Sequence, residues 1–211
     1  MGAERSAPDA IATRRVTRWI RRPEVLIVGR GGRFVWGLMA ARLSGIQNEI
    51  DPLNLENPVL ASLKTYWHAK RGTRAMPARA DINPAEMKEH LGWVMLLDAL
   101  PGFLDFRYRV IGTRVTQYFI SESTGKTVTE VFEPYGEAAV KGVQAVYRKA
   151  ARDKTIVRSY GGAGWLGRSF LDFDALAMPL SDDGETANMV MSVFTFDFAH
   201  LSETRETTSL S

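Results

Sequence analysis

The spacing of apolar residues changes along the chain, and this change predicts where helices end and strands begin. Apolar positions at helical spacing follow Asn57, which caps a predicted helix that runs to Gly72. A similar start signal at Asn83, with a proline after it, predicts a second helix that ends near Leu91. The longest helix is predicted over 135–152, where apolar residues recur every three or four positions.

Strands are predicted where apolar and polar residues alternate, or where a short apolar run lies between turn residues. The predicted strands are residues 93–98, 106–111, 155–160, 168–180 and 188–198. A short helix is predicted over 113–119, and Asp183-Gly184 indicates a hairpin turn between the last two strands. Because strands are grouped with strands, the pattern predicts an α+β fold, an antiparallel sheet with helices packed on one face.

The composition is that of a folded domain without thiol chemistry. Apolar residues make up 45% and charged residues 24% of the 211 positions, enough apolar surface to offset chain entropy. The chain contains no cysteine, which excludes disulfides, thiolate metal sites and cysteine nucleophiles. His68 and His90 fall near predicted helix ends, where the helix dipole explains them, and His200 falls in a polar tail. We therefore expect neither a metal site nor catalytic activity.

The positive charge of the chain is concentrated at its N-terminus. Residues 1–50 carry nine arginines and four acidic residues, whereas the remaining residues have a net charge of −2. The sequence is accordingly divided into a basic N-terminal extension (1–54), a main domain (55–200) and a polar tail (201–211). Residues 9–22 have the pattern of a short basic amphipathic helix, suited to an anionic membrane or to phosphates. The alternatives are a segment without fixed structure, or a chain that starts at Met39.

No segment has the pattern of a signal peptide or a membrane span. The apolar run at 25–28 is interrupted by arginines soon after it and is shorter than a signal sequence requires. No stretch approaches the roughly 18 uninterrupted apolar residues of a membrane-spanning helix. We therefore expect a cytoplasmic protein.

Several motifs, in this order, resemble those of a PAS domain, and most closely the proteobacterial family of small stand-alone PAS-like proteins. They are Tyr66-Trp67, Met76–Pro84, Asp105–Thr113, Thr124–Lys126 and Met178–Gly184. The resemblance covers about 58–198 and implies a five-stranded sheet in the order 2-1-5-4-3, with helices that enclose a small cavity. One departure is Phe119-Ile120-Ser121-Glu122, where the family has a glycine or arginine before an acidic residue.

The resemblance also bears on cofactors. PAS proteins that bind haem commonly take a histidine from the long helix, and residues 135–152 contain none. The flavin photoreceptor type requires a cysteine, so a flavin–cysteine adduct is excluded. No cofactor is predicted, and a small organic ligand remains open. The candidate pocket residues are Tyr118, Phe119, Tyr147 and Trp165, whose alternative role is ordinary core packing.

Two arginines on one predicted strand form a candidate anion contact. Alternation places Arg107 and Arg109 on the same face, where two guanidinium groups could hold a carboxylate, a phosphate or an acidic patch of a partner. The alternative is a solvent-facing surface on which both arginines pair with acidic residues of neighbouring strands.

The resemblance implies a sensory or protein-interaction module. In 211 residues there is no room for an output domain beside the PAS-like body, so action in trans in bacterial signalling is expected, on a partner protein or a second copy. Leu60, Leu63 and Trp67 of the helix that flanks the core are predicted to form a dimer contact. The alternative is a peripheral membrane or nucleic-acid adaptor that works through the arginines of residues 5–33.

Overall fold

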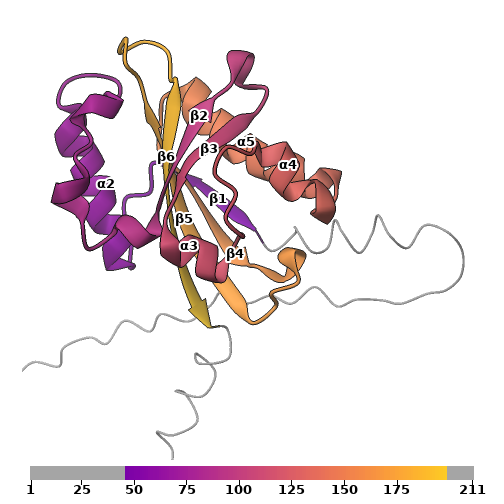
Figure 1. Cartoon of the computed structure of the whole chain (residues 1–211). Helices are drawn as coiled ribbons and strands as arrows, with labels where there is room; N and C mark the ends of the chain where they lie inside the picture. Colours follow the sequence, from indigo (N-terminus) through magenta and orange to yellow (C-terminus); the bar gives the residue numbers. More distant parts are fainter. Residues whose placement is uncertain (1–45, 199–211) are drawn as a thin grey trace, which may run out of the picture. The chain divides into compact units, whose positions relative to one another are not determined.

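The computed structural model describes residues 46–198, which form a six-stranded antiparallel sheet covered by helices (Figure 1). The strands are β1 (Gln47–Ile50), β2 (Val94–Ala99), β3 (Phe106–Ile111), β4 (Val157–Gly162), β5 (Leu171–Leu180) and β6 (Met189–Phe198). They lie in the order β1-β4-β5-β6-β2-β3. The five predicted strands, which are β2 to β6, therefore follow the predicted order 2-1-5-4-3.

Strand β1 is an addition to the five-stranded prediction, and it comes from residues that the sequence analysis placed in the basic extension. It pairs with β4 at the edge of the sheet. Its sequence, Gln-Asn-Glu-Ile, is too short and too polar to show strand periodicity. Side-chain contacts with β4 hold it: the Tyr160 hydroxyl donates to Gln47 Oε1 at 2.8 Å, and Arg158 lies 3.3 Å from Glu49. The predicted amphipathic helix at 9–22 and the polar tail at 201–211 lie outside the described residues.

Residues 46–198 include four α-helices, which are α2 (Pro58–Arg71), α3 (Thr113–Tyr118), α4 (Val128–Phe132) and α5 (Glu137–Asp153). Two of them, α2 and α4, begin at a side-chain cap. The predicted first helix is confirmed: the Asn57 side chain accepts hydrogen bonds from the amides of Val59 and Leu60, at 3.0 and 3.3 Å. At its other end Gly72 adopts a φ of 58°, a conformation that glycine adopts without steric strain.

The predicted helix from Asn83 to Leu91 is wrong in type. Asn83 does act as a cap and accepts a hydrogen bond from Ala85 N at 3.0 Å, but the chain forms only two short 3₁₀ turns, Pro84–Met87 and Leu91–Trp93. Only Met87 of these turns is buried. Without a continuous apolar face there is no packing to extend the turn into an α-helix.

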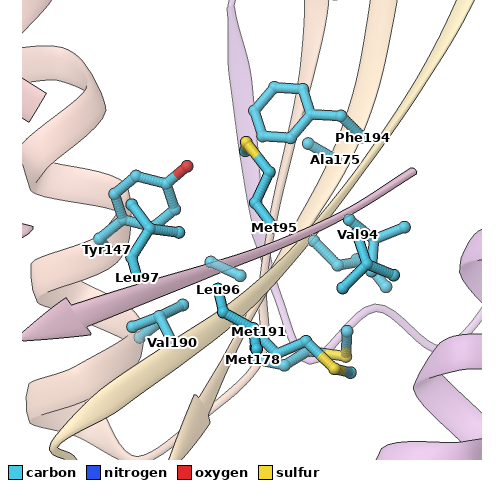
Figure 2. Packing of buried hydrophobic residues seen from close by; sticks show 14 of the residues in the cluster. Val94, Met95, Leu96, Leu97, Tyr147, Ala175, Met178, Val190, Met191 and Phe194 are labelled. Carbon is cyan, nitrogen blue, oxygen red and sulfur yellow. The ribbon is translucent and has the colours of Figure 1, made fainter. Parts of the chain in front are cut away.

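Helices cover both faces of the sheet, not one face as the sequence pattern predicted. α2 lies on one side, and α4 and α5 lie on the other (Figure 1). In the register of β5 and β6, Met178 pairs with Met191 and Ala175 pairs with Phe194; the two pairs lie on opposite faces (Figure 2). The reason is that β5 is buried without interruption over 175–180, so both of its faces need a cover.

The apolar face of α2 belongs to this core. Leu60, Leu63 and Trp67 are 0%, 1% and 1% exposed, and the indole Nε1–H of Trp67 donates to the carbonyl of Pro179 at 2.9 Å. This overturns the expectation that the three side chains are available to a second chain. They are already covered by the sheet of their own chain.

The hairpin turn between β5 and β6 forms where Asp183-Gly184 predicted it. The Asp183 carboxylate accepts hydrogen bonds from Thr186 N and the Ser181 hydroxyl, both at 2.7 Å, and from Glu185 N at 2.8 Å. These donors, the amide of Thr186 first, lower the pKa of Asp183 to about 2. Gly184 has a φ of 78°, the left-handed conformation that the turn requires.

Candidate functional site

A cavity of about 180 Å³ lies between α5 and the sheet. α5 contributes one wall through Ala139, Gly142, Val143 and Tyr147, because these positions share one face of the helix. β4, β5 and β6 supply the opposite wall. Ile46 and Asn48, at the start of the described chain, also line the cavity, so the added edge strand takes part in the site.

Five aromatic side chains, which we call the aromatic cluster, form much of the lining. They are Phe119, Phe132, Trp165, Phe173 and Phe194. The ring centroid of Phe119 lies 4.8 Å from that of Phe194, and those of Phe132 and Trp165 are 5.7 Å apart. Such separations are typical of favourable aromatic pairs. The cluster joins α3, α4, the loop after β4 and two strands, so the cavity is built from distant parts of the sequence.

The polar part of the lining consists of the Asn48 amide and of hydroxyl groups, among them those of Tyr147 and Ser192. Ser192 Oγ–H donates to the carbonyl of Leu176 at 3.1 Å. Burial raises the pKa of Tyr147 to about 12, although hydrogen bonds with Ser192 and Tyr108 act in the opposite direction. Burial, and next the proximity of Tyr147, raise the pKa of Tyr108 well above its usual value. Both phenols are therefore neutral hydrogen-bonding groups at physiological pH.

One polar group at this site has no hydrogen-bond partner among the described residues. Trp165 is 7% exposed, and its indole Nε1–H is unpaired. A buried donor without an acceptor typically lowers stability by about 1–3 kcal/mol. None of the described residues that line the cavity is charged. The lining is therefore uncharged and largely apolar and aromatic.

The structure brings three of the four predicted pocket residues together. Phe119, Tyr147 and Trp165 all line the cavity. Tyr118 does not: it is half-buried at the end of α3, and its ring centroid lies 6.1 Å from that of Phe196. A one-residue step along a short helix turns neighbouring side chains to different sides, which separates Tyr118 from Phe119.

Sequence reasoning missed the other three rings of the aromatic cluster. Phe173 and Phe194 point to the same face of the sheet, because Phe173 pairs with Phe196 and Ala175 pairs with Phe194. The Asp183-Gly184 hairpin signal, counted outward as a two-residue turn, pairs Phe173 with Phe194; this differs from the observed register by two residues but places both rings on the same face. Phe132 lies at the end of α4, and nothing local indicates that it reaches the cavity.

The predicted arginine pair lies away from the cavity, on the exposed side of β3. The two oxygens of Asp98 accept hydrogen bonds from Arg109 Nε at 2.9 and 3.1 Å. Arg107 is the register partner of Asp98 across the β2–β3 pair, and its side chain is exposed. Arg109 thus adopts the alternative of an ion-paired sheet surface, and such exposed pairs contribute little to stability.

Two further properties concern the part of the chain that the structure describes. Within it, no three His, Asp or Glu side chains are grouped to hold a metal ion. No helix between residues 46 and 198 has the length and the hydrophobicity to cross a membrane. His68 lies on α2, across the sheet from the cavity.

These features define a class: an α+β domain with an antiparallel sheet and a cavity under its long helix. The sequence profile of one family, described as PAS domain, matches residues 55–195, well over half of the chain. The chain therefore belongs to the PAS domain family, whose members serve in general as sensory and interaction modules. No curated protein and no solved structure matches the chain.

Proposed function

We propose that the chain is a non-catalytic sensory module in bacterial signalling that acts in trans on a partner protein. A small organic molecule in the cavity is its signal. The observation that carries the proposal is the cavity of about 180 Å³ beneath α5, whose lining is uncharged and largely apolar and aromatic.

The size and lining of the cavity favour a small molecule over a large cofactor. Pockets for drug-sized ligands occupy about 300–1,000 Å³, whereas this cavity measures about 180 Å³. No histidine is among the described residues that line it, so the lining offers no imidazole ligand for a haem iron. The residues present suit packing around a compact apolar body.

A ligand can act as a signal only if it binds one conformation of the protein better than another. β1 is the element best placed to respond, since it lines the cavity and, among the strands of residues 46–198, pairs only with β4. Its attachment includes the Arg158–Glu49 ion pair and the hydrogen bond from Asp51 N to Ile156 O at 2.8 Å. We therefore expect ligand occupancy to change how firmly β1 is held at the sheet edge.

Native mass spectrometry of the purified full-length chain, combined with an absorbance spectrum, tests the proposal. A mass excess that disappears on denaturation would identify a retained ligand, and the same spectrum reports whether the chain is a monomer or a dimer. The proposal fails if the chain carries no ligand and no compound in a broad small-molecule screen raises its melting temperature.

The membrane or nucleic-acid adaptor is the second candidate, and the arginines of residues 5–33 favour it. Its test is the binding of the full chain to anionic vesicles and to duplex DNA at increasing salt. Binding that weakens steeply with salt would support the adaptor, because released counterions then drive association.

A further inference from the structure

We infer that residues 34–41 of this chain dock across the opening of the cavity beneath α5. The docking itself does not depend on the proposed function. One consequence does rest on it: a small molecule that enters the cavity has to displace the segment, so that ligand binding acts on the N-terminal extension.

The exposure of the lining residues shows where the cavity opens. Most of the described lining residues are buried. Five are half-buried or exposed, and we call them the rim: Ile46, Asn48, Gly142, Val143 and Val146. The first two lie at the start of β1, and the other three lie close together near the middle of α5. The cavity therefore opens to solvent between β1 and α5.

The rim suits an uncharged, apolar segment. Ile46, Val143 and Val146 are half-buried, so a chain laid across them removes further apolar surface from water. None of the described lining residues is charged, so an ionised side chain placed here would lose its hydration without gaining an opposite charge.

The chain that leads into Ile46 contains a segment of this kind. Residues 34–41, Phe-Val-Trp-Gly-Leu-Met-Ala-Ala, are eight consecutive uncharged residues between Arg33 and Arg42. No other uncharged run in residues 1–50 is as long. The segment therefore matches the rim in chemistry, whereas the arginine-rich part of the extension does not.

The length of chain between the segment and the rim allows the contact. Four residues, 42–45, precede Ile46, and a fully extended chain of four residues spans at most about 14 Å. Because Ile46 itself belongs to the rim, the segment reaches the opening without crossing the domain. A short tether also gives an effective concentration in about the millimolar range, so a weak contact is enough to keep the segment docked.

Photo-crosslinking of the dialysed full-length chain, with p-benzoylphenylalanine in place of Trp36, tests this inference. On irradiation the benzophenone bonds to C–H groups that it touches, and mass spectrometry of the digested product locates the bond. We expect crosslinks to residues 142–146 of α5, in a product with the mass of one chain. Leu38→Asp places a charge in the segment and should lower the yield of these crosslinks about tenfold. Leu26→Asp makes the same change elsewhere in the extension and should alter the yield by less than about twofold.

Two results would overturn the inference. Crosslinks that are spread over the domain, or that do not form, would show that the segment does not dock on the rim. A product with the mass of two chains would show that it docks on a second copy and not on its own chain.

These results are distinguishable from a failure of the proposed function, which native mass spectrometry and the ligand screen test separately. Crosslinks to α5 without any retained or screened ligand would support the docking and refute the proposed function. A retained ligand, together with a dialysed chain that gives no such crosslinks, would refute the docking and leave the proposed function standing.

Discussion

Replacing Trp67 with phenylalanine is expected to lower the free energy of unfolding by about 2 kcal/mol. The indole N–H of Trp67 donates to Pro179 O at 2.9 Å, and the side chain is 1% exposed. Phenylalanine keeps an aromatic ring but has no donor, so a buried carbonyl loses a partner, which typically accounts for about 1–3 kcal/mol. The smaller ring also leaves some space beside Leu60 and Leu63, and this adds to the loss.

Urea denaturation followed by far-ultraviolet circular dichroism measures the change without depending on tryptophan fluorescence. For a denaturant slope of about 2 kcal/mol/M, the midpoint should fall by about 1 M. Trp93→Phe is the matched control at a half-buried ring, and we expect it to lose less than about 1 kcal/mol. Light scattering should give the same mass for Trp67→Phe as for the unmutated chain. Unchanged stability with a reduced mass would refute the reasoning, because it would place the ring between two chains instead of in the core.

Three other predictions follow from the structure. Arg158→Lys should lower the free energy of unfolding by about 1–2 kcal/mol, since lysine cannot reproduce the two 2.8 Å hydrogen bonds to Asp174 while reaching Glu49; an unchanged urea midpoint would contradict this. The ionised Asp183 carboxylate stabilises the turn at pH values above about 4, which is the pKa of an aspartate in the unfolded chain. This contribution is lost as the pH falls towards about 2, the pKa of Asp183 in the folded protein. Urea midpoints from pH 5 to 2 should therefore decrease less in Asp183→Asn, and parallel curves would be evidence against it. Gly142→Ala should stabilise α5 by up to about 1 kcal/mol, because the added Cβ meets nothing within 4 Å; a destabilised variant would show that the space is not there.

Structural features that depend on a few neighbouring residues were predicted correctly from the sequence. The cap at Asn57, the stop at Gly72 and the hairpin turn at Asp183 depend on hydrogen bonds and backbone conformations within five residues of each position. Such interactions form in almost any tertiary setting, so the sequence determines them locally. The order of the five predicted strands was right as well, but it came from the resemblance to PAS domains.

Elements that depend on a distant partner were missed or mistaken. β1 is a strand only because the edge of β4 provides hydrogen bonds from far along the chain, as in the pair Asn48–Ser159, which is 111 residues apart. The cap at Asn83 is present, but Met87 is the one buried residue of the two turns that follow, so the segment has no continuous apolar face and forms 3₁₀ turns. For α2, an apolar stripe has the same spacing whether a partner chain or the sheet covers it, and only the fold shows that the sheet does.

The candidate site, too, was determined partly by the sequence and partly by the tertiary structure. The sequence supplied several aromatic rings and predicted Phe119, Tyr147 and Trp165 as pocket residues, all of which line the cavity. Tertiary structure decided which rings meet: the β5–β6 register brings Phe173 and Phe194 to the face where Phe119 lies, and Trp165 is left without an acceptor. The physical reason is that helix caps and turns are satisfied by near neighbours, whereas a cavity is the space that remains after distant segments have packed.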